Sequence, residues 1–317
     1  MKGVFLDYGT VSAGDLDPAP LQRALPGVVL HEVSRQDQVI ERAQGAAVLF
    51  VNKLTIDRAV IGALPELRVI GLTATGTNNV DLVAARERGI AVCNIRDYCT
   101  PSVAQHVLGA ILALTHRYAD YTRLAREQWG QSPQFTMLDY PIRELRGRVL
   151  GVVGWGVLGQ AVARACEAAL GMRVLVAQRA GGEPAPDRVP LHELLPQVDV
   201  LTLHCPITPQ TQGMLGRAQL ALMKPDALVV NTARGALIDV AALADALRAG
   251  KLGGAAIDVL PQEPPVDGSP LFATDLPNLI LTPHTAWAAR ESRQRAIDEI
   301  AANVADCLAG GRRGRVV

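Results

Sequence analysis

The chain has 317 residues, of which 49% are hydrophobic and 20% charged. That length accommodates two domains with separate cores, and the composition is typical of a folded protein rather than a disordered one. Lysine plus arginine and aspartate plus glutamate both number 31. No net field therefore draws the chain to nucleic acid or to an anionic membrane, and we expect neither as a partner. The basic stretch GRRGRVV (311–317) is predicted to be a solvated end.

Neither a targeting segment nor a membrane span is apparent. The first residues, MKGVFLDYGT, lack the long apolar stretch of a signal peptide, and the apolar run 107–114 is too short to cross a bilayer. The five cysteines are scattered, without a C-x-x-C pair or zinc-like spacing. We therefore expect reduced thiols, no metal site and a cytoplasmic location.

Short runs rich in Val, Ile and Leu alternate with helical patterns along the chain. The predicted strands of the first hundred residues are KGVFL, AAVLFV, RVIGLT and IAVCN, with helical patterns at 56–63 and 80–88. A second series follows: RVLGVVG, RVLVA, VDVLTLH, ALVVNTA, GGAAIDV and LILTPH. Strands that are apolar throughout favour parallel sheets covered on both faces. The sequence predicts an α/β protein with two doubly wound parallel-sheet domains.

Two longer helical segments bear on the domain boundaries. The first, 101–117, follows Thr100-Pro101 and is a candidate bridge between domains. The second, about 288–309, places Ile297, Ile300, Val304 and Leu308 on one face. If this helix packs on the first domain, that domain is discontinuous in sequence.

The segment RVLGVVGWGVLG (148–159) runs a strand into G-x-G-x-x-G and then into a helical pattern. In that setting Gly154, Gly156 and Gly159 permit a tight turn, a close approach of backbone to a pyrophosphate, and helix–strand packing. A packing turn without a nucleotide is the alternative. The context after a strand and before a helix favours dinucleotide binding.

The residue after the next predicted strand is expected to contact the adenosine ribose, and an acidic side chain there selects NAD. This chain has Gln178 followed by Arg179. Glutamine does not repel a 2′-phosphate, and arginine can pair with it. The pair favours NADP over NAD, the alternative being an Arg179 that stacks on the adenine or points into solvent.

Three later residues fit one active site. Arg234 lies in NTARG, Glu263 in DVLPQEPP and His284 in TPHTAW. An imidazole exchanges a proton near neutral pH, a neighbouring carboxylate stabilises its charged form, and a guanidinium matches a substrate carboxylate. Taken singly, each residue has a structural alternative in packing, a strand end or a turn. Together they predict hydride exchange with a hydroxy acid. His31, His106, His116, His192 and His204 lack such a context, and we assign them no catalytic role.

These motifs resemble those of the D-isomer-specific 2-hydroxyacid dehydrogenases over nearly the whole chain. The matching segments include ATGTNNVD (74–81), RDYCTPSVAQHV (96–107), LHCPITPQT (203–211), NTARGALID and TPHTAWAAR. TPSVAQH, LDYPIREL and HTAW are most similar to the glycerate dehydrogenase/hydroxypyruvate reductase branch.

The resemblance implies a flavodoxin-like substrate-binding domain, 1–98 and 286–317, and a Rossmann NAD(P)-binding domain, 99–285. It implies that Arg234 binds the substrate carboxylate and carbonyl, that His284 is the acid/base, and that Glu263 partners the histidine. It further implies a homodimer formed around 101–140. The cofactor residues that it adds to the glycines and to Gln178 and Arg179 are Val157, Leu158, Cys205, Pro206, Thr211, Thr232, Ala233 and Asp258.

The substrate is the least determined feature. The resemblance implies that Thr75 and Gly76 offer backbone N–H groups to the substrate carboxylate, and Trp287 is a candidate wall of the pocket. Asn52-Lys53 is either near the pocket or a solvated strand end. A small polar pocket suits hydroxypyruvate or glyoxylate, reduced to D-glycerate or glycolate. The alternatives are another substrate on the same machinery, such as D-lactate, a bulkier 2-hydroxy acid or phosphite, and a dinucleotide-sensing interaction protein.

Overall fold

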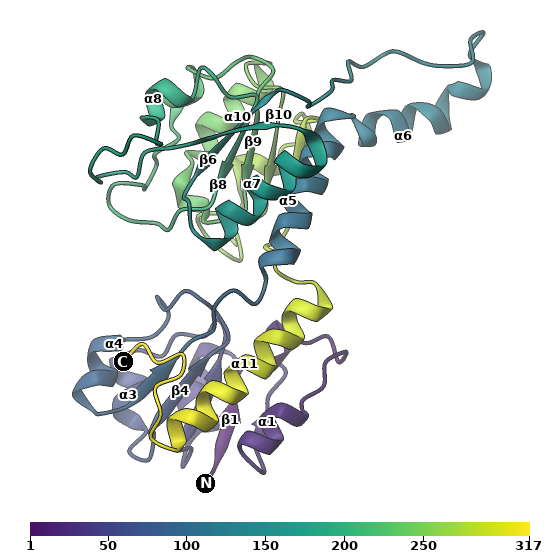
Figure 1. The fold of residues 1–317 in the computed structure, drawn as a ribbon. Helices are drawn as coiled ribbons and strands as arrows, with labels where there is room; N and C mark the ends of the chain where they lie inside the picture. Colours follow the sequence, from purple (N-terminus) through teal and green to yellow (C-terminus); the bar gives the residue numbers. More distant parts are fainter. The chain divides into compact units, whose positions relative to one another are not determined.

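The computed structural model describes residues 1–317, which form two compact units. One unit comprises Met1–Cys99 and Trp287–Val317, and the other comprises Thr100–Ala286. Each unit is built on one parallel sheet with helices against it (Figure 1). The predicted fold class, two parallel-sheet α/β domains, is therefore confirmed.

The sheet of the first unit has five strands in the order β2-β1-β3-β4-β5, which is the flavodoxin-like order. Their bounds are β2 (Val29–Leu30), β1 (Gly3–Phe5), β3 (Val48–Val51), β4 (Val69–Leu72) and β5 (Ala91–Cys93). Every pair is parallel, and all but the edge strand β2 are buried along their length. The sequence analysis did not predict β2, because a two-residue strand with an exposed Val29 carries almost no pattern.

Helices from both ends of the chain cover this sheet. They are α1 (Ala19–Ala24), α2 (Val39–Ala43), α3 (Arg58–Ala63), α4 (Leu82–Glu87) and α11 (Arg290–Leu308). The predicted apolar face of α11 packs into the core, where Ile297, Ile300 and Val304 are fully buried. Gly71 on β4 permits this approach, because a Cβ there would lie 2.8 Å from Val304 Cγ2.

The basic segment 311–317 is solvated only in part: Arg312, Arg313 and Arg315 are exposed, as the sequence analysis predicted, but the backbone is paired. Its backbone runs antiparallel to β5, with a bridge between Cys93 and Arg315. Asn94 N donates to Gly314 O at 2.9 Å, and Val316 N donates to Val92 O at 2.7 Å. The physical reason is that β5 is an edge strand, and this segment satisfies backbone groups that would otherwise be exposed.

The sheet of the second unit has six strands in the order β11-β10-β9-β8-β6-β7, all parallel. Their bounds are β6 (Val149–Val153), β7 (Arg173–Val176), β8 (Val200–Leu203), β9 (Leu228–Asn231), β10 (Gly254–Ile257) and β11 (Leu279–Leu281). Its helices are α5 (Thr100–Thr115), α7 (Val157–Leu170), α8 (Leu191–Leu194), α9 (Arg217–Leu220) and α10 (Val240–Arg248). Beyond β7, one parallel bridge joins Ala177 to Val189. Pro190 follows at once and lacks the N–H that would extend this pairing.

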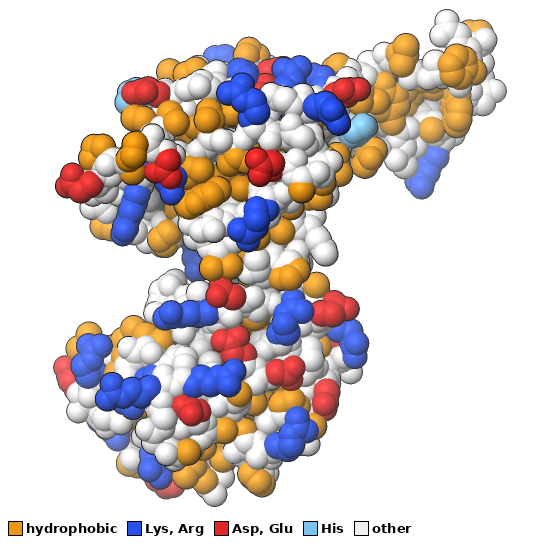
Figure 2. All heavy atoms as spheres, viewed as in Figure 1, with side chains coloured by type: hydrophobic (Ala, Val, Ile, Leu, Met, Phe, Trp, Pro, Cys, Tyr) orange, Lys and Arg blue, Asp and Glu red, His pale blue; other side chains and the backbone are white.

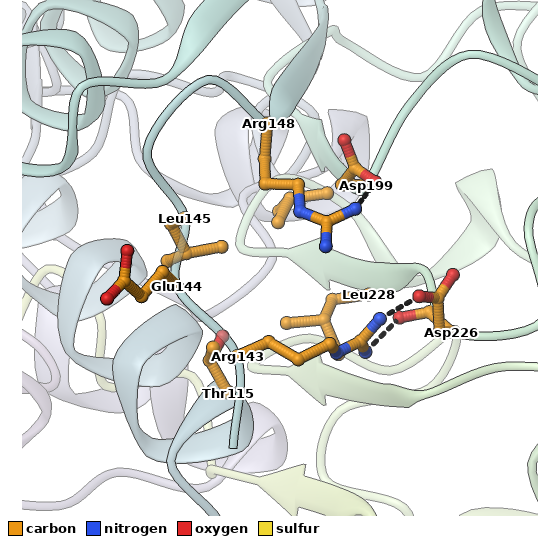
Figure 3. Close-up of a pocket in the computed structure, with 9 residues that line it drawn as sticks. Thr115, Arg143, Glu144, Leu145, Arg148, Asp199, Asp226 and Leu228 are labelled. Carbon is orange, nitrogen blue, oxygen red and sulfur yellow. Dashed lines mark hydrogen bonds and ion pairs between the residues drawn. The ribbon is translucent and has the colours of Figure 1, made fainter. Parts of the chain in front are cut away.

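The amino end of this sheet is closed by ion pairs. Arg143 pairs with Asp226, while Asp199 accepts from Lys224 at 2.9 Å and lies 3.5 Å from Arg148 (Figure 3). Burial opposes ionisation of Asp199, but the Val149 N–H and the Lys224 ammonium hold its pKa below the usual value. The cavity among these residues holds about 20 Å³, the space of a single water.

One part of the second unit projects from the sheet. Helix α6 (Tyr118–Glu127) and the irregular chain after it extend away from the body of the unit (Figure 1). Large apolar side chains are exposed along this arm, including Trp129 at 53%, Phe135 at 90% and Leu138 at 82%. Hydrophobic atoms gather over it in the space-filling view (Figure 2).

Elsewhere in that view, basic and acidic side chains are interspersed, in agreement with the balanced composition (Figure 2). No helix of the protein combines the length and the apolar character needed to cross a bilayer.

Candidate active site

The catalytic candidates follow neighbouring strands of the second sheet. Asn231 at the end of β9 and Leu281 at the end of β11 both pair with Ile257 at the end of β10. Arg234, Glu263 and His284 come after these positions, each in the loop that leaves its strand. The carboxyl ends of parallel strands meet at one edge of a sheet, which is where open α/β folds bind ligands. The structure therefore places all three candidates at that edge within one unit.

The imidazole of His284 contacts the carboxylate of Glu263. Nδ1 of the histidine lies 2.6 Å from Oε2 of the glutamate, and the other carboxylate oxygen accepts the Leu260 N–H at 2.9 Å. An ionised carboxylate only accepts hydrogen bonds, so Nδ1 carries the proton in this pair. Nε2 is then the nitrogen that can exchange a proton with a ligand.

The backbone at His284 has a positive φ of 55°, which is uncommon for a residue other than glycine. Asp258 holds this conformation. Its carbonyl accepts the His284 N–H at 2.8 Å, and its carboxylate accepts Thr282 Oγ1 at 2.5 Å. The same carboxylate accepts the backbone N–H groups of Thr285 at 2.8 Å and Ala286 at 2.9 Å. Asp258 thus anchors the turn that presents the histidine, a role that the sequence analysis did not foresee.

The loop that carries Arg234 is fixed by Asn231. The asparagine side chain accepts the Ala233 N–H at 3.0 Å and donates to the Arg234 carbonyl at 2.9 Å. A Cβ on Gly235 would lie 2.0 Å from the carbonyl carbon of Leu260, so only glycine lets this loop reach the loop of Glu263. The guanidinium is exposed and donates to the Ala233 carbonyl at 2.7 Å. The sequence analysis missed Asn231, although an amide at the end of a buried strand is a recognisable signal.

The glycine-rich loop joins β6 to α7, next to the loop that follows β8. Gly154 has a φ of 99°, and a Cβ there would lie 2.5 Å from the His204 carbonyl carbon. A Cβ on Gly159 would lie 2.0 Å from the Gly154 oxygen, whereas one on Gly156 would have no neighbour within 4 Å. The sheet order reverses between β6 and β8, so this loop lies at the topological switch point.

The loop has the features that a pyrophosphate requires. Two glycines bring backbone segments together, and the third leaves open space in front of the first turn of α7. The first N–H groups of a helix lack intrahelical partners, and here they belong to Val157 and Leu158. In the loop after β9, Thr232 Oγ1 is buried without a hydrogen-bond partner. The residues present therefore fit a dinucleotide.

Comparison with known proteins agrees with this geometry. The family model described as "D-isomer specific 2-hydroxyacid dehydrogenase, NAD binding domain" matches residues 108–286. The chain belongs to this family. It is an enzyme of the D-2-hydroxyacid dehydrogenase type, and its cofactor is a nicotinamide dinucleotide.

Similar proteins extend over nearly the whole chain. A glycerate dehydrogenase of Methylorubrum extorquens is 44% identical, with 86% of each chain covered. A hydroxypyruvate reductase of Blautia hydrogenotrophica is 38% identical, with 98% of each covered. Among solved structures, a protein of Thermus thermophilus is 36% identical and aligns with a TM-score of 0.87 over 100% of both chains. These relatives support the glycerate dehydrogenase/hydroxypyruvate reductase branch that the motifs indicated.

In this dehydrogenase, the loop after β8 is closed by Thr211. Its hydroxyl donates to the Pro206 carbonyl at 2.8 Å and accepts the Thr208 N–H at 2.8 Å. Cys205, which precedes Pro206, is partly buried, and burial raises the pKa of its thiol. This loop borders the glycine-rich loop through the contact of Gly154 with His204 and Cys205.

The residues expected to choose the cofactor follow β7. The Gln178 side chain accepts the Ala185 N–H at 3.2 Å and donates to the carbonyls of Gly182 and Glu183, so it shapes the loop that follows it. Arg179 is exposed. The sequence analysis missed a second cation here. The second cation is Arg188. It lies beside Gln178, because the Gln178 N–H donates to the carbonyl of Val189, the residue after Arg188, at 2.7 Å. The Arg188 guanidinium lies 5.6 Å from the centroid of the Trp155 ring.

The substrate candidates Thr75, Gly76 and Trp287 belong to the first unit. The Thr75 carbonyl accepts Asn94 Nδ2 at 2.7 Å, and the Trp287 ring meets Tyr98 edge-on at 6.2 Å. Trp287 follows His284 by three residues in the connection between β11 and α11, whereas the loop of Thr75 and Gly76 contains none of the catalytic three.

Asn52 is only 4% exposed, with its N–H bonded to Asp7 at 2.9 Å, so the alternative of a solvated strand end is wrong for Asn52. Its neighbour Lys53 is exposed. The Asp7 carboxylate accounts for the burial of Asn52, because it accepts the backbone N–H groups of the residues that follow β3.

Among the histidines to which we assigned no role, His204 is distinctive. Burial lowers the pKa of its imidazole to about 4, Nε2 lies 2.9 Å from Thr202 Oγ1, and Nδ1 is buried without a partner. It is a neutral packing residue beneath the glycine-rich loop. No group of His, Cys, Asp and Glu side chains gathers in a way that could hold a metal ion.

Proposed function

We propose that this enzyme reduces a small 2-keto acid with NAD(P)H, converting hydroxypyruvate to D-glycerate and glyoxylate to glycolate. The observation that carries the proposal is the 2.6 Å contact between His284 and Glu263, at the same sheet edge as Arg234 and in the same unit as the glycine-rich loop. The names of the relatives, glycerate dehydrogenase and hydroxypyruvate reductase, support this choice of substrate.

His284 is the acid in the reductive direction. A reduced nicotinamide, when bound, would supply the hydride to the carbonyl carbon. Negative charge then develops on the carbonyl oxygen, and the Nε2 proton of the imidazolium neutralises it. Glu263 stabilises the imidazolium through Nδ1 and holds the ring in place. In the oxidative direction the neutral imidazole accepts the hydroxyl proton.

Arg234 binds the substrate carboxylate and polarises the carbonyl. Its planar guanidinium offers parallel donors that match a carboxylate, which lysine cannot reproduce. Thr75 and Gly76 add backbone N–H groups to the carboxylate, and Trp287 forms a wall of the pocket. On this account the first unit is the substrate-binding domain, and the second is the NAD(P)-binding domain that also supplies Arg234, Glu263 and His284. Asp258 would in addition hold the nicotinamide carboxamide.

NADP is the favoured cofactor. The end of β7 carries no acidic side chain at the position of Gln178, and Arg179 and Arg188 flank it. An uncharged amide tolerates a 2′-phosphate, which an acidic residue would repel, and Arg179 is the neighbouring cation without a carboxylate partner, since Arg188 pairs with Asp187. Val157, Leu158, Cys205, Pro206, Thr211, Thr232 and Ala233 complete the proposed cofactor contacts.

We also propose a cytoplasmic homodimer. The arm around α6 exposes Trp129, Phe135 and Leu138, and large apolar side chains exposed together mark an interaction surface. A second copy of the chain is the occupant that the family resemblance implies. Phe135→Asp with Leu138→Asp should convert a dimer to a monomer in light scattering. A native protein that is monomeric at micromolar concentration would contradict this proposal.

Steady-state kinetics test the function. Reduction of hydroxypyruvate, glyoxylate and pyruvate is measured with NADPH and with NADH. The proposal predicts the highest kcat/KM for hydroxypyruvate with NADPH. Activity with NADH alone would keep the reaction and contradict the cofactor preference. Absence of turnover on all three acids would contradict the proposed substrate class.

A further inference from the structure

The loop that follows β4 presents two adjacent backbone N–H groups without partners. They belong to Thr75 and Gly76, and neither donates a hydrogen bond within the protein. Thr75 is exposed and Gly76 is half-buried, so a ligand can reach this loop. Nearly all backbone donors of a folded protein are paired, and successive donors left free favour the binding of an anion.

The carbonyl groups of the same two peptide bonds are held by the residues that follow β5. Ala74 O accepts the Ile95 N–H at 3.4 Å, and Thr75 O accepts Asn94 Nδ2 at 2.7 Å. Both peptide bonds are trans, and a planar trans peptide directs its C=O and its N–H in opposite directions. The anchored carbonyls therefore turn the N–H groups of Thr75 and Gly76 away from β5.

The bond to Thr75 is the only hydrogen bond of the Asn94 side chain. Asn94 is 4% exposed, and its Oδ1 is buried without a partner. The opposite orientation of the amide would set this oxygen against the Thr75 carbonyl, so the nitrogen faces the loop. A buried acceptor without a donor destabilises the fold. What the protein gains from the buried amide is the fixed position of the Thr75 carbonyl.

Asn94 is itself fixed from two sides. Its N–H donates to Gly314 O at 2.9 Å, and its carbonyl accepts Asn303 Nδ2 at 2.9 Å. Gly314 has a φ of 60°, and a Cβ there would lie 2.3 Å from Asn303 Nδ2 and 2.7 Å from Asn94 O. Helix α11 and the segment 311–317 thus hold rigid the residue that holds the loop.

We propose that Asn94 is a positioning residue for the substrate carboxylate and acts through the Gly76 N–H. This inference rests on the proposed function, in which Thr75 and Gly76 bind that carboxylate. Thr75 O and the Gly76 N–H belong to one peptide group, so the hydrogen bond from Asn94 fixes the direction of this N–H and polarises it as a donor. A donor that is already oriented need not be ordered when the substrate binds.

Steady-state kinetics of Asn94→Asp and Asn94→Ala test the inference. The first variant removes the donor with little change in volume, and the second removes the whole amide. Both should raise KM for hydroxypyruvate about tenfold, because the carboxylate loses an oriented partner. The kcat should stay within about threefold of native, since the carboxylate is bound alike before and during hydride transfer. A merely structural role would lower the melting temperature without separating KM from kcat.

Oxamate gives a readout that does not depend on turnover. It carries the carboxylate of a keto acid and is not reduced, so calorimetry in the presence of NADPH measures its binding alone. Its Kd should rise in the Asn94 variants by the same factor as KM. The affinity for NADPH should be unchanged, because the glycine-rich loop belongs to the other unit.

The matched controls are Asn278→Asp and Asn278→Ala. Asn278 is also an asparagine whose Nδ2 donates to a backbone carbonyl, that of Leu252 at 3.3 Å, but it lies at the amino end of the six-stranded sheet. These variants should leave KM, kcat and oxamate binding unchanged. Should neither Asn94 variant fold, Asn303→Ala takes their place, since it removes the bond that holds the Asn94 carbonyl and should raise KM several-fold.

Two outcomes separate this inference from the proposed function. If the native chain reduces hydroxypyruvate and the folded variants keep its KM and its affinity for oxamate, the role of Asn94 is overturned and the proposed function stands. If the native chain reduces no keto acid, the proposed function is contradicted, and the substrate role of this loop is overturned with it.

Discussion

The two ends of the six-stranded sheet treat their polar residues in opposite ways. At the amino end, Arg143 and Arg148 are matched by Asp226 and Asp199, and the remaining space holds about one water (Figure 3). At the carboxyl end, Arg234 is exposed, and no carboxylate pairs with its guanidinium. Charges that satisfy one another stabilise the fold, whereas a cation presented by a rigid loop is available to a ligand.

The backbone differs between the two ends at one position. Close approaches occur at both, because a Cβ on Gly154, Gly159 or Gly235 at the carboxyl end, or on Gly253 at the amino end, would meet neighbouring backbone at 2.5 Å or less. At the carboxyl end, however, His284 keeps a positive φ because Asp258 holds the turn. Backbone strain of this kind at a residue other than glycine concentrates at functional sites. The comparison predicts that changes at the carboxyl end affect catalysis and that changes at the amino end affect only stability.

The largest expected effect is at Arg234. Arg234→Ala should lower kcat/KM for hydroxypyruvate about 100- to 1000-fold, because a preorganised donor to the developing charge is typically worth about 3–4 kcal/mol. NADPH affinity, measured by fluorescence titration, should be unchanged. Arg234→Lys should recover only part of the loss. Near-normal turnover of the alanine variant would remove Arg234 from the site.

The glycines sharpen the comparison within the cofactor loop. Gly159→Ala should destabilise the protein by about 1–3 kcal/mol, because its Cβ would lie 2.0 Å from the Gly154 oxygen. Gly156→Ala has no protein atom within 4 Å of its Cβ and should leave the melting temperature nearly unchanged while weakening NADPH binding. Normal NADPH binding by Gly156→Ala would contradict the proposal that the pyrophosphate approaches the backbone at Gly156.

These expectations show what the sequence could and could not predict. Features that depend on a local pattern or a short motif could be predicted. These are the strands, the glycine-rich loop and the order of Arg234, Glu263 and His284. The role of Asn231 was missed although its bonds lie within its own loop, and that of Asp258 could not be predicted, because it depends on hydrogen bonds between loops that follow different strands. The pairing of 311–317 with β5 was missed for the same reason, since nothing in GRRGRVV is typical of a strand.

A pH effect on stability is expected from His204, beneath the glycine-rich loop. Burial lowers its pKa to about 4 in the folded protein, below that of an exposed imidazole. The unfolded chain therefore binds the proton first, and stability falls as pH decreases from about 6.5 towards 4. Between pH 7 and pH 5 the loss is on the order of 2 kcal/mol. Urea unfolding at several pH values measures the loss in the native protein and in His204→Gln. The free energy of unfolding should depend more steeply on pH in the native protein than in the variant. An equal pH dependence would assign the imidazole to a solvated environment.

The smallest effect is expected at the amino end. Arg143→Ala should cost less than about 1 kcal/mol of stability, because its ion pair with Asp226 is partly exposed and screened by solvent. The kcat and KM for keto-acid reduction should not change. A large loss of activity in this variant, without unfolding, would contradict the assignment of the amino end to stability alone.

The most direct test of the central claim is single-turnover hydride transfer in His284→Ala. A titration first establishes that the variant binds NADPH as tightly as the native protein does. NADPH oxidation by hydroxypyruvate is then followed by absorbance in stopped flow. Loss of the acid should lower the rate about 100- to 10,000-fold while NADPH still binds. A rate within a few-fold of native, with cofactor and substrate both bound, would contradict the claim that His284 carries the proton transfer.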